Sequence, residues 1–217
     1  MGTDRQRNPE RILAVLHELG ADVIALQEVD RRFGRRETVL PRELVEERHW
    51  RVAALKMRPA SMGWHGNAIL VAPHVDVLGA EPIDLPAIEP RGAVCAHLSA
   101  GGREFCVVGM HLDLSGLLRR KQVDAVCGHI AALGKPAVML GDLNEWSQRG
   151  GALRGFAGAW SVLQPGRSFP STRPLAQLDR IVHSEHWDCE DAAVHHSALS
   201  AMASDHLPVK ASLSLTA

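Results

Sequence analysis

The chain has 217 residues, of which 46% are hydrophobic, and its 24 lysines and arginines nearly balance its 25 aspartates and glutamates. This length can bury a substantial core, so we expect one domain over residues 1–217. A general nucleic-acid binder usually presents a basic face, and the near-neutral balance argues mildly against that class.

The sequence also argues against a membrane-embedded protein. It contains no run of about 18 apolar residues, and its first residues lack the apolar core of a signal peptide. We therefore expect a soluble, cytoplasmic protein without stable membrane insertion. The sequence leaves the oligomeric state open.

The first predicted elements are a helix and a short buried strand. Asn8 can cap a helix with Pro9 in its first turn, and Gly20 can end it. Residues 23–26 then form a continuous apolar run that is typical of a buried strand. Glu28 follows this strand closely, at a position where sites in α/β proteins commonly lie.

Further strand-like stretches follow, separated by glycine and proline residues. They span residues 50–57, 67–72, 92–99 and 103–110. A helix is predicted over residues 116–133, since Ser115 can cap it and Gly134 can end it. Later strands are expected over residues 138–140, 178–182 and 207–215. Mixed strands with few helices, and no internal repeat or linker, indicate the α+β class.

Four cysteines lie far apart in the sequence: Cys95, Cys106, Cys127 and Cys189. No CxxC pair occurs, and no Cys/His cluster has the linear spacing of a zinc site. We therefore interpret the cysteines as buried free thiols rather than as a disulfide framework or a structural zinc site.

The most informative motif follows the predicted strand at residues 138–140. Gly141 gives the end of such a strand backbone room for a close ligand, and Asp142 and Asn144 come next. Side chains alternate along extended backbone, so Asp142 and Asn144 point to the same side if the strand geometry persists. The carboxylate accepts protons and the amide donates hydrogen bonds, which suits a site that orients water and grips a phosphate oxygen.

Five other short segments carry the same kind of signal near strand ends. They are Gln27-Glu28, Gly66-Asn67, His111-Leu112, Leu178-Asp179 and Ser204-Asp205-His206. Together with the Gly141-Asp142 motif, and in this order within residues 8–213, they resemble the endonuclease/exonuclease/phosphatase superfamily. This resemblance implies a DNase I-like, four-layer α/β/β/α sandwich, in which two packed sheets are flanked by helices and the motifs converge at one edge.

For Glu28 the residues alone leave two interpretations open, a metal ligand and a solvated loop carboxylate. Mg²⁺ is usually held by one or two carboxylates together with waters and the substrate phosphate, so Glu28 and Asp205 can form such a site. The resemblance implies that Glu28 binds the metal. We expect Mg²⁺ or Mn²⁺ as the cofactor on these two carboxylates.

The resemblance also implies roles for the other motif residues. Asp142 orients or deprotonates the attacking water, and Asn144 holds a non-bridging phosphate oxygen. Asp179 accepts a hydrogen bond from His206, which fixes the tautomer of this histidine and raises its basicity. His111 hydrogen-bonds the scissile phosphate or protonates the leaving oxygen. The alternative for His206 is a buried histidine with a structural role.

Asn67 and Arg91 are candidate substrate-binding residues, each with an alternative. Asn67 matches a position that helps to build the substrate cleft in the family, but a loop asparagine can also stabilise its own turn. Arg91 can hold a phosphate, or it can pair with Glu89 or Glu104 at the surface. The basic stretch at residues 31–36 can bind a phosphate-rich ligand or form a solvated loop.

The start of the chain departs from the family pattern. Such proteins usually begin with an apolar strand that ends in an asparagine of the metal and phosphate site, and residue 1 falls where the loop after that strand should be. We therefore expect a sandwich that lacks the usual first strand, with exposed backbone edges and apolar surface beside the gap. Reduced stability, weaker metal binding or pairing with a partner strand can follow.

The expected function is metal-dependent hydrolysis of a phosphoester bond by in-line attack of water, as a phosphodiesterase or a phosphatase. The substrate class stays open between nucleic acid, phospholipid and sugar phosphate. A catalytically weak or inactive binding protein of the same fold is the alternative that the absent strand favours. A zinc hydrolase is disfavoured, because the expected ligands are mainly oxygens.

Overall fold

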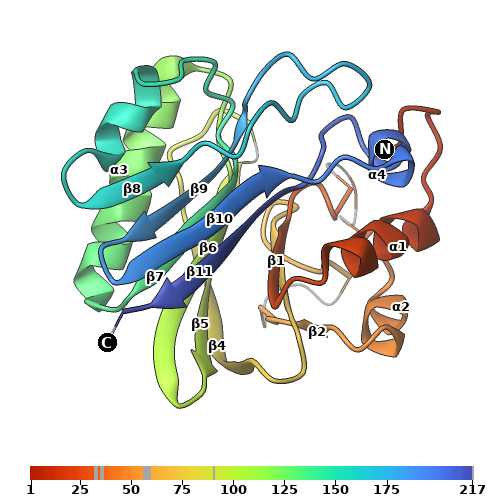
Figure 1. Ribbon diagram of the computed structural model, residues 1–217, viewed down its shortest axis with the longest axis horizontal. Helices are drawn as coiled ribbons and strands as arrows, with labels where there is room; N and C mark the ends of the chain where they lie inside the picture. Colours follow the sequence, from red (N-terminus) through yellow and green to blue (C-terminus); the bar gives the residue numbers. More distant parts are fainter. Residues whose placement is uncertain (32–33, 35–36, 56–59, 90, 217) are drawn as a thin grey trace.

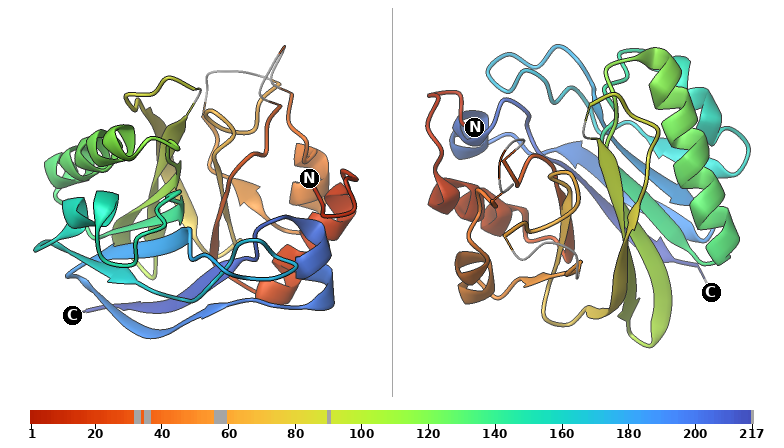
Figure 2. Two further views of the ribbon diagram at one scale, coloured as in Figure 1. Left: turned by 90° about the horizontal axis from the view of Figure 1, so that it is seen from above. Right: turned by 180° about the vertical axis from the view of Figure 1, so that it is seen from behind.

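The computed structural model describes residues 1–217 except 32–33, 35–36, 56–59, 90 and 217. Two layers of strands pack face to face, with helices outside them (Figures 1 and 2). One layer is a six-stranded sheet whose outer face is covered by α3 (Gly116–Leu133). The other layer consists of a three-stranded and a two-stranded sheet. This arrangement confirms the predicted α+β sandwich.

The six-stranded sheet aligns the ends of its central strands. Its spatial order is β4 (Asp76–Ile83), β5 (Gly92–Ala100), β6 (Arg103–His111), β7 (Ala137–Asp142), β9 (Asp179–Ser184) and β8 (Trp160–Leu163). β6 and β7 are parallel and connected through α3, whereas the other neighbours are antiparallel. The register pairs His111 with Asp142, and Asp142 with Asp179. These three predicted site residues therefore lie in one row at the end of the sheet.

The second layer is split into two sheets on one face of the six-stranded sheet. The first has the order β1 (Val23–Leu26), β3 (Ala68–Val71), β2 (Arg51–Val52), and the second pairs β10 (Trp187–Val194) with β11 (Val209–Leu215). β1 contacts β6 and β7, whereas β11 contacts β9. β1 and β11 thus lie on either side of a gap over the central strands (Figure 1).

The first helix forms as its capping residues predict. The side chain of Asn8 accepts a hydrogen bond from the backbone N–H of Arg11 at 3.0 Å, and Gly20 ends the helix with a φ of 57°. Leu13 and Leu16 are buried against the three-stranded sheet. Figure 1 labels this first helix α1 (Pro9–Leu19). Besides α3, the other helices are α2 (Arg42–Glu47), α4 (Ala198–Ala203) and the 3₁₀ helix η1 (Gly151–Phe156). None of the helices that the structure describes is long and apolar enough to cross a membrane.

Some elements match their predictions closely and others carry little signal in the sequence. The strand at 23–26 and the helix at 116–133 have the predicted bounds, although the side chain of Ser115 makes no capping hydrogen bond. The strand predicted over 50–57 is reduced to β2, and residues 56–57 of it lie outside the described residues. The sequence pattern does not predict β4, β8 or β10, because most of their side chains are half-buried or exposed, which weakens the apolar signal.

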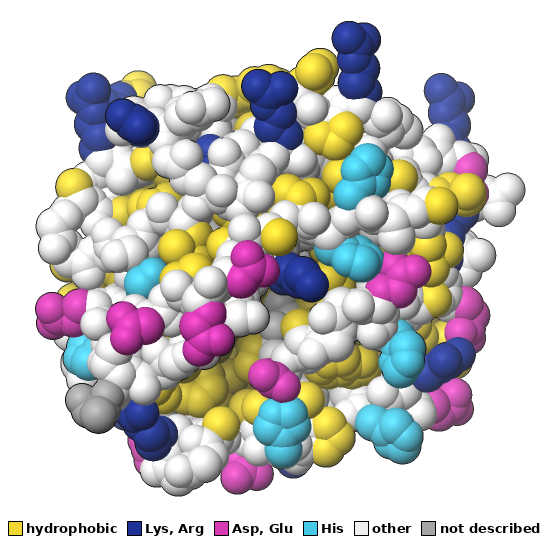
Figure 3. Space-filling model, in the orientation of Figure 1, with side chains coloured by type: hydrophobic (Ala, Val, Ile, Leu, Met, Phe, Trp, Pro, Cys, Tyr) yellow, Lys and Arg dark blue, Asp and Glu magenta, His cyan; other side chains and the backbone are white. Residues whose placement is uncertain are grey.

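A cavity of about 960 Å³ extends along the gap between β1 and β11. Its apolar lining includes Leu26, Leu140, Ile181 and Leu213, and Figure 3 shows hydrophobic side chains on the floor of a hollow on this face. No strand fills the gap in the described part of the chain. β1 and β11 are therefore edge strands that present backbone donors and acceptors to the cavity.

We expect an apolar strand ending in asparagine, added upstream of residue 1, to raise the melting temperature. Its side chains would fill the cavity between β1 and β11, and each fully buried apolar side chain contributes about 1.5–3 kcal/mol. The measurement is thermal unfolding of both proteins, with Mg²⁺ affinity followed by calorimetry, which we expect to tighten through the added asparagine. An extension with serine at the apolar positions is the control. Equal melting temperatures and equal metal affinities for all three proteins would contradict the prediction.

Candidate active site

A cluster of acidic, basic and histidine side chains lies where the central strands end beside the cavity. The residues of this cluster that line the cavity are Glu28, Arg91, His111, Asp142, Asn144, Asp179, Asp205 and His206. These are all the residues that the sequence predicts for the site except Asn67. The fold therefore brings together residues that are up to 178 positions apart in the sequence, namely Glu28 and His206.

The backbone at the end of β7 fixes the position of Asp142. Gly141 has a φ of 145°, and a Cβ atom there would come within 1.9 Å of a backbone oxygen of β6, so the close strand pairing requires glycine. The backbone N–H of Asn144 donates to Asp142 Oδ1 at 2.8 Å. The other carboxylate oxygen, Oδ2, lies 3.4 Å from His111 Nε2 and 3.9 Å from His206 Nε2. Asp142 thus presents one oxygen to two histidines.

Asn144 reaches the cavity through a different geometry from the predicted one. Its φ of 50° is left-handed, so the strand geometry does not continue from Asp142 to Asn144. The side-chain Nδ2 donates to the carbonyl oxygen of Leu112 at 2.9 Å. The condition for strand alternation is therefore not met here, although both residues line the cavity. A turn conformation, which asparagine tolerates better than most residues, brings its amide to the end of β6.

His206 and Asp179 form the predicted pair. His206 Nδ1 lies 2.9 Å from Asp179 Oδ2, so the carboxylate holds the proton on Nδ1. The hydroxyl of buried Ser168 donates to the same Asp179 oxygen. The ring of Phe169 packs against the imidazole with 4.7 Å between ring centroids. His206 is therefore held by its hydrogen bond to Asp179, which Ser168 supports, and by packing against Phe169.

Burial and neighbouring charges act in opposite directions on the pKa values of His206 and Asp142. Burial lowers the pKa of His206, but the hydrogen bond to Asp179 and the negative charges of Asp179 and Asp142 raise it to about 9. Burial raises the pKa of Asp142, but the hydrogen bond from His111 and the charges of both histidines outweigh burial and hold the pKa below its usual range. Without a bound metal, His206 is protonated and Asp142 is ionised at neutral pH.

His111 ends β6 between Arg91 and Asp142. Arg91 Nη1 forms a hydrogen bond with His111 Nε2, and Arg91 Nη2 lies 3.5 Å from Glu89 Oε2. A guanidinium only donates, so Nε2 accepts when the ring is neutral, whereas a protonated ring can donate from this atom to Asp142. Glu104, the other predicted partner of Arg91, instead bonds a lysine at 2.6 Å. Arg91 is thus a nearly buried residue of the cluster and not only a surface partner of Glu89.

Two exposed carboxylates border the cluster. Glu28 follows β1 with a φ of 57°, an uncommon conformation for a residue other than glycine. The backbone of Gly66 lies close to Glu28. A Cβ atom built on Gly66 would be only 3.3 Å from the Cα atom of Glu28. Asp205 is exposed after α4, whereas the adjacent His206 is half-buried. The two neighbouring side chains therefore have different surroundings.

The donor atoms of the cluster fit a hard divalent cation. Glu28, Asp142, Asp179 and Asp205 bring four carboxylates to the cavity. Mg²⁺ and Mn²⁺ prefer such oxygen ligands. Because Glu28 and Asp205 are exposed while Asp142 and Asp179 are buried beside histidines, the exposed pair is the better placed to receive an ion from solvent.

Asn67 does not reach the cluster. It is fully buried, and its Nδ2 donates to the carbonyl oxygens of Gly92 at 2.9 Å and Trp64 at 3.2 Å. Asn67 thereby ties the turn before β3 to the start of β5, next to Arg91. This supports the alternative of a turn-stabilising residue. The predicted role of the basic stretch at 31–36 concerns mainly residues 32–33 and 35–36, which lie outside the described residues.

Two residues beside the cluster have no clear signal in the sequence. Ser168 lies 11 positions before Asp179, and only the fold reveals that it supports this carboxylate. Trp146 is exposed, and its ring meets that of Phe169 edge-on with 6.5 Å between centroids. An exposed indole near a site can stack on a base or a sugar ring.

The layered fold and the row of His and Asp side chains define a DNase I-like protein. Residues 2–206 match the model of the Endonuclease/Exonuclease/phosphatase family, and the chain belongs to this family. It is 29% identical over 129 residues to the "Uncharacterized protein YbhP" of Escherichia coli K12, which covers 55% of this chain and 51% of that relative. The chain thus spans about half the length of the curated relatives it matches.

Solved structures agree with this fold. The endonuclease/exonuclease/phosphatase from Bacteroides vulgatus superposes with a TM-score of 0.76 at 15% identity, covering 97% of this chain and 91% of that chain. The mannosyl-6-phosphatase from Bacteroides thetaiotaomicron gives a TM-score of 0.73 at 19% identity, with coverage of 97% and 91%. At these identities the similarity establishes the shared fold.

We expect the stability of the metal-free protein to fall as the pH rises from about 6.5 through about 9, the pKa of folded His206. A raised pKa means that the folded state binds the proton more tightly, so the stabilisation is fully present at low pH and is lost above the folded pKa. The loss is on the order of 3 kcal/mol at most. Chemical denaturation in EDTA across this range measures it.

The matched variants are His206→Gln, which should flatten this part of the pH profile, and His74→Gln as the control. His74 also pairs with a carboxylate, Asp22 at 3.0 Å, but both side chains are largely exposed and the pair is screened by solvent. An unchanged slope in His206→Gln would show that another group causes the pH dependence.

Proposed function

We propose that this chain hydrolyses phosphoester bonds by in-line attack of water, with Mg²⁺ or Mn²⁺ as cofactor. The observation that carries the proposal is the row of His111, Asp142 and Asp179 at the sheet end, joined by His206 and bordered by the exposed carboxylates. Membership of the Endonuclease/Exonuclease/phosphatase family supports a hydrolase of this kind.

Glu28 and Asp205 would hold the metal ion. A bound divalent cation stabilises the negative charge that develops on the phosphoryl group. The side chains of Glu28 and Asp205 are exposed and line the same cavity as Asp142. The uncommon backbone conformation of Glu28 is of the kind found at functional positions, where the surrounding structure holds it.

Asp142 is the candidate for orienting the attacking water. Its carboxyl is ionised at neutral pH, and the Asn144 backbone N–H occupies Oδ1, which leaves Oδ2 facing the histidines. A fixed carboxylate oxygen can accept a hydrogen bond from water and direct its lone pair at phosphorus. The Asn144 side chain has a further amide N–H to offer a phosphate oxygen beyond its bond to the backbone.

His206 and Arg91 supply positive charge and hydrogen-bond donors to the cluster. His206, held by Asp179 through Nδ1, can donate from Nε2 to a phosphoryl oxygen. Arg91 adds a permanent charge whose planar fork suits a phosphate, and its bond to His111 Nε2 orients that ring. Proton transfer to the leaving oxygen falls to His111 or His206, both of which lie beside Asp142.

A catalytically weak or inactive binding protein of the same fold is the second candidate. The gap in the second layer favours it, because the cavity adjoins the cluster and no strand of the described residues fills it. A Mg²⁺-titrated assay with DNA, RNA, phospholipid and sugar-phosphate substrates separates the two candidates. It also decides the substrate class. Binding of a phosphate ester without turnover at any metal concentration would favour the second candidate.

We expect Glu28→Gln to abolish Mg²⁺-dependent turnover while changing the free energy of unfolding by no more than about 0.5 kcal/mol, since the side chain is exposed. Turnover, Mg²⁺ affinity and circular dichroism are measured on the same preparation. Glu43→Gln, an exposed carboxylate on α2, is the control and should retain turnover. Undiminished activity in Glu28→Gln would remove this residue from the site.

We expect Asp179→Asn to lower kcat by about 10²–10⁴ with a smaller change in KM, because His206 loses the group that fixes its tautomer and its charge. The double variant with His206→Ala should be no worse than the single His206→Ala, since residues that act as one unit are removed only once. Asp188→Asn, exposed on β10, is the matched control. Additive losses in the double variant would show that Asp179 and His206 do not act as one unit.

A further inference from the structure

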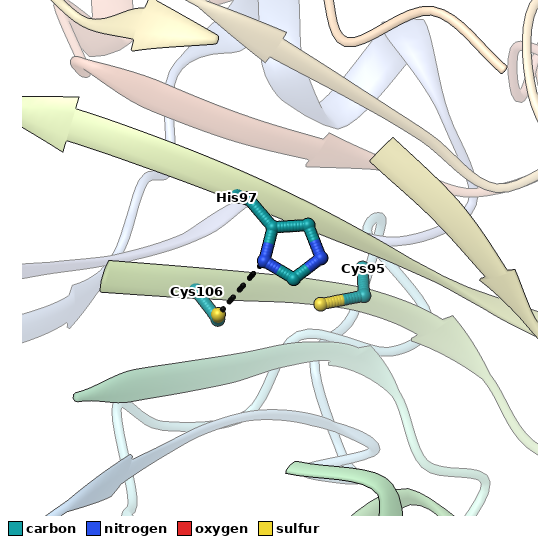
Figure 4. A group of neighbouring side chains, drawn as sticks. All are labelled: Cys95, His97 and Cys106. Carbon is teal, nitrogen blue, oxygen red and sulfur yellow. Dashed lines mark hydrogen bonds between the residues drawn. The ribbon is translucent and has the colours of Figure 1, made fainter. Parts of the chain in front are cut away.

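A second cluster of metal-binding side chains lies on the outer face of the six-stranded sheet. Cys95 and His97 of β5 and Cys106 of β6 each bring one donor atom within 4.8 Å of the other two, and Figure 4 shows them gathered on neighbouring strands. Glu81 of β4 and His129 of α3 border this group, and together with Cys95 they form a second group within the same limit. Four elements therefore meet at one cluster.

The strand register creates this cluster. His97 lies directly opposite Cys106, and Cys95 stands two residues earlier on the same face of β5. Cys106 Sγ is 3.5 Å from His97 Nδ1. In a tetrahedral zinc site, with bonds of about 2.3 Å to sulfur and about 2.0–2.1 Å to nitrogen, these two donors lie about 3.6 Å apart. The observed separation is thus the one that a shared zinc ion needs.

Glu81 sets the tautomer of His97. Its Oε1 lies 2.9 Å from His97 Nε2 and 3.1 Å from His129 Nε2. An ionised carboxylate only accepts, so the proton of His97 is on Nε2 and the lone pair of Nδ1 faces Cys106. Histidines that bind metal through one nitrogen usually donate the other N–H to such a carboxylate. His97 already has this support.

The two thiols suit a metal better than a disulfide. Cys95 and Cys106 are fully buried and free. They are diagonal neighbours, because Cys95 pairs with Val108 and Cys106 with His97. Diagonal Cα atoms lie about 7–8 Å apart, beyond the usual disulfide limit of about 6.8 Å. Both sulfur atoms therefore stay available to a shared ion.

We propose that Cys95, His97 and Cys106 bind Zn²⁺, with Glu81 or His129 available as a fourth ligand. Two thiolates and an imidazole select zinc over Mg²⁺. His97, Glu81 and His129 are half-buried, so an ion can enter from solvent past their side chains. The site lies five residues before His111 on β6, about 17 Å along the strand and on its other face. It is separate from the candidate active site and would tie β4, β5, β6 and α3 together.

Co²⁺ titration of the reduced, EDTA-stripped full chain tests the proposal. Thiolate ligands give Co²⁺ a charge-transfer absorption in the near ultraviolet, whereas the oxygen and nitrogen donors of the candidate active site do not. We expect this band to saturate at one equivalent in the wild-type chain and to be bleached by Zn²⁺. Cys95→Ala and Cys106→Ala should lose the band. His97→Gln should weaken Co²⁺ affinity by about 10–100-fold.

Matched controls separate the site from other thiols and from loss of fold. Cys127→Ala and Cys189→Ala remove cysteines outside the cluster and should retain the band, as should Glu28→Gln. Circular dichroism and melting of each stripped variant report folding. If Cys106→Ala does not fold, the half-buried His97→Gln carries the test.

Three outcomes would overturn the proposal. They are a wild-type chain without the thiolate band, a band that persists in both cluster cysteine variants, and equal loss in Cys127→Ala. Any of them leaves the proposed phosphoester hydrolysis untouched, because that reaction uses other residues.

Discussion

The parallel pairing of β6 with β7 is the constraint on which the candidate active site depends. It places His111 against Asp142, and the antiparallel pairing of β7 with β9 then places Asp179 beside Asp142. A slip of one residue would turn each of these side chains to the opposite face of the sheet. Parallel strands need a long crossover, which α3 supplies, and the close approach at Gly141 leaves no room for another residue. The site is thus specified by strand register before any side chain interacts.

The buried carboxylates of Asp142 and Asp179 are stabilised by the neighbouring histidines. A buried carboxylate is costly unless it is paired and hydrogen-bonded. Asp142 accepts a hydrogen bond from the Asn144 N–H and lies 3.4 and 3.9 Å from the Nε2 atoms of His111 and His206, and Asp179 accepts from Ser168 and His206. Removing one member leaves its partners buried without compensation, so the groups act as a unit both in stability and in the proposed chemistry.

The sequence is informative where local chemistry determines structure. The caps of α1 and the Gly-Asp motif after β7 are local signals, and both lie where they were predicted. The left-handed turn at Asn144 is not visible in an alternation pattern. The role of Ser168 depends on contact across 11 residues and carries no periodic signal. The split of the second layer follows from strand pairing, which hydrophobic patterns do not specify.

The Cys/His cluster is a clearer example of a feature that the sequence pattern does not predict. Zinc motifs in sequence depend on short spacings along a turn or helix, and none is present among these cysteines. Cys95, His97 and Cys106 instead become neighbours because two antiparallel strands align them in a particular register. The absence of a linear motif therefore excluded a local zinc site and had no bearing on one assembled across a sheet.

Strand alternation keeps the two proposed metal sites apart on the single strand β6. A Cβ atom on Gly109 would lie 3.1 Å from Ala25 Cβ, so Gly109 and His111 face the second layer, whereas Cys106 and Val108 belong to the core under α3. The inner face offers hard oxygen donors at its end, and the outer face offers sulfur and imidazole, so each site prefers a different ion. The second layer is interrupted by the cavity beside β1, whereas the outer face of β6 packs into the core under α3. A metal bound to β5 and β6 on that outer face would reinforce the same strand pairing that positions His111 against Asp142.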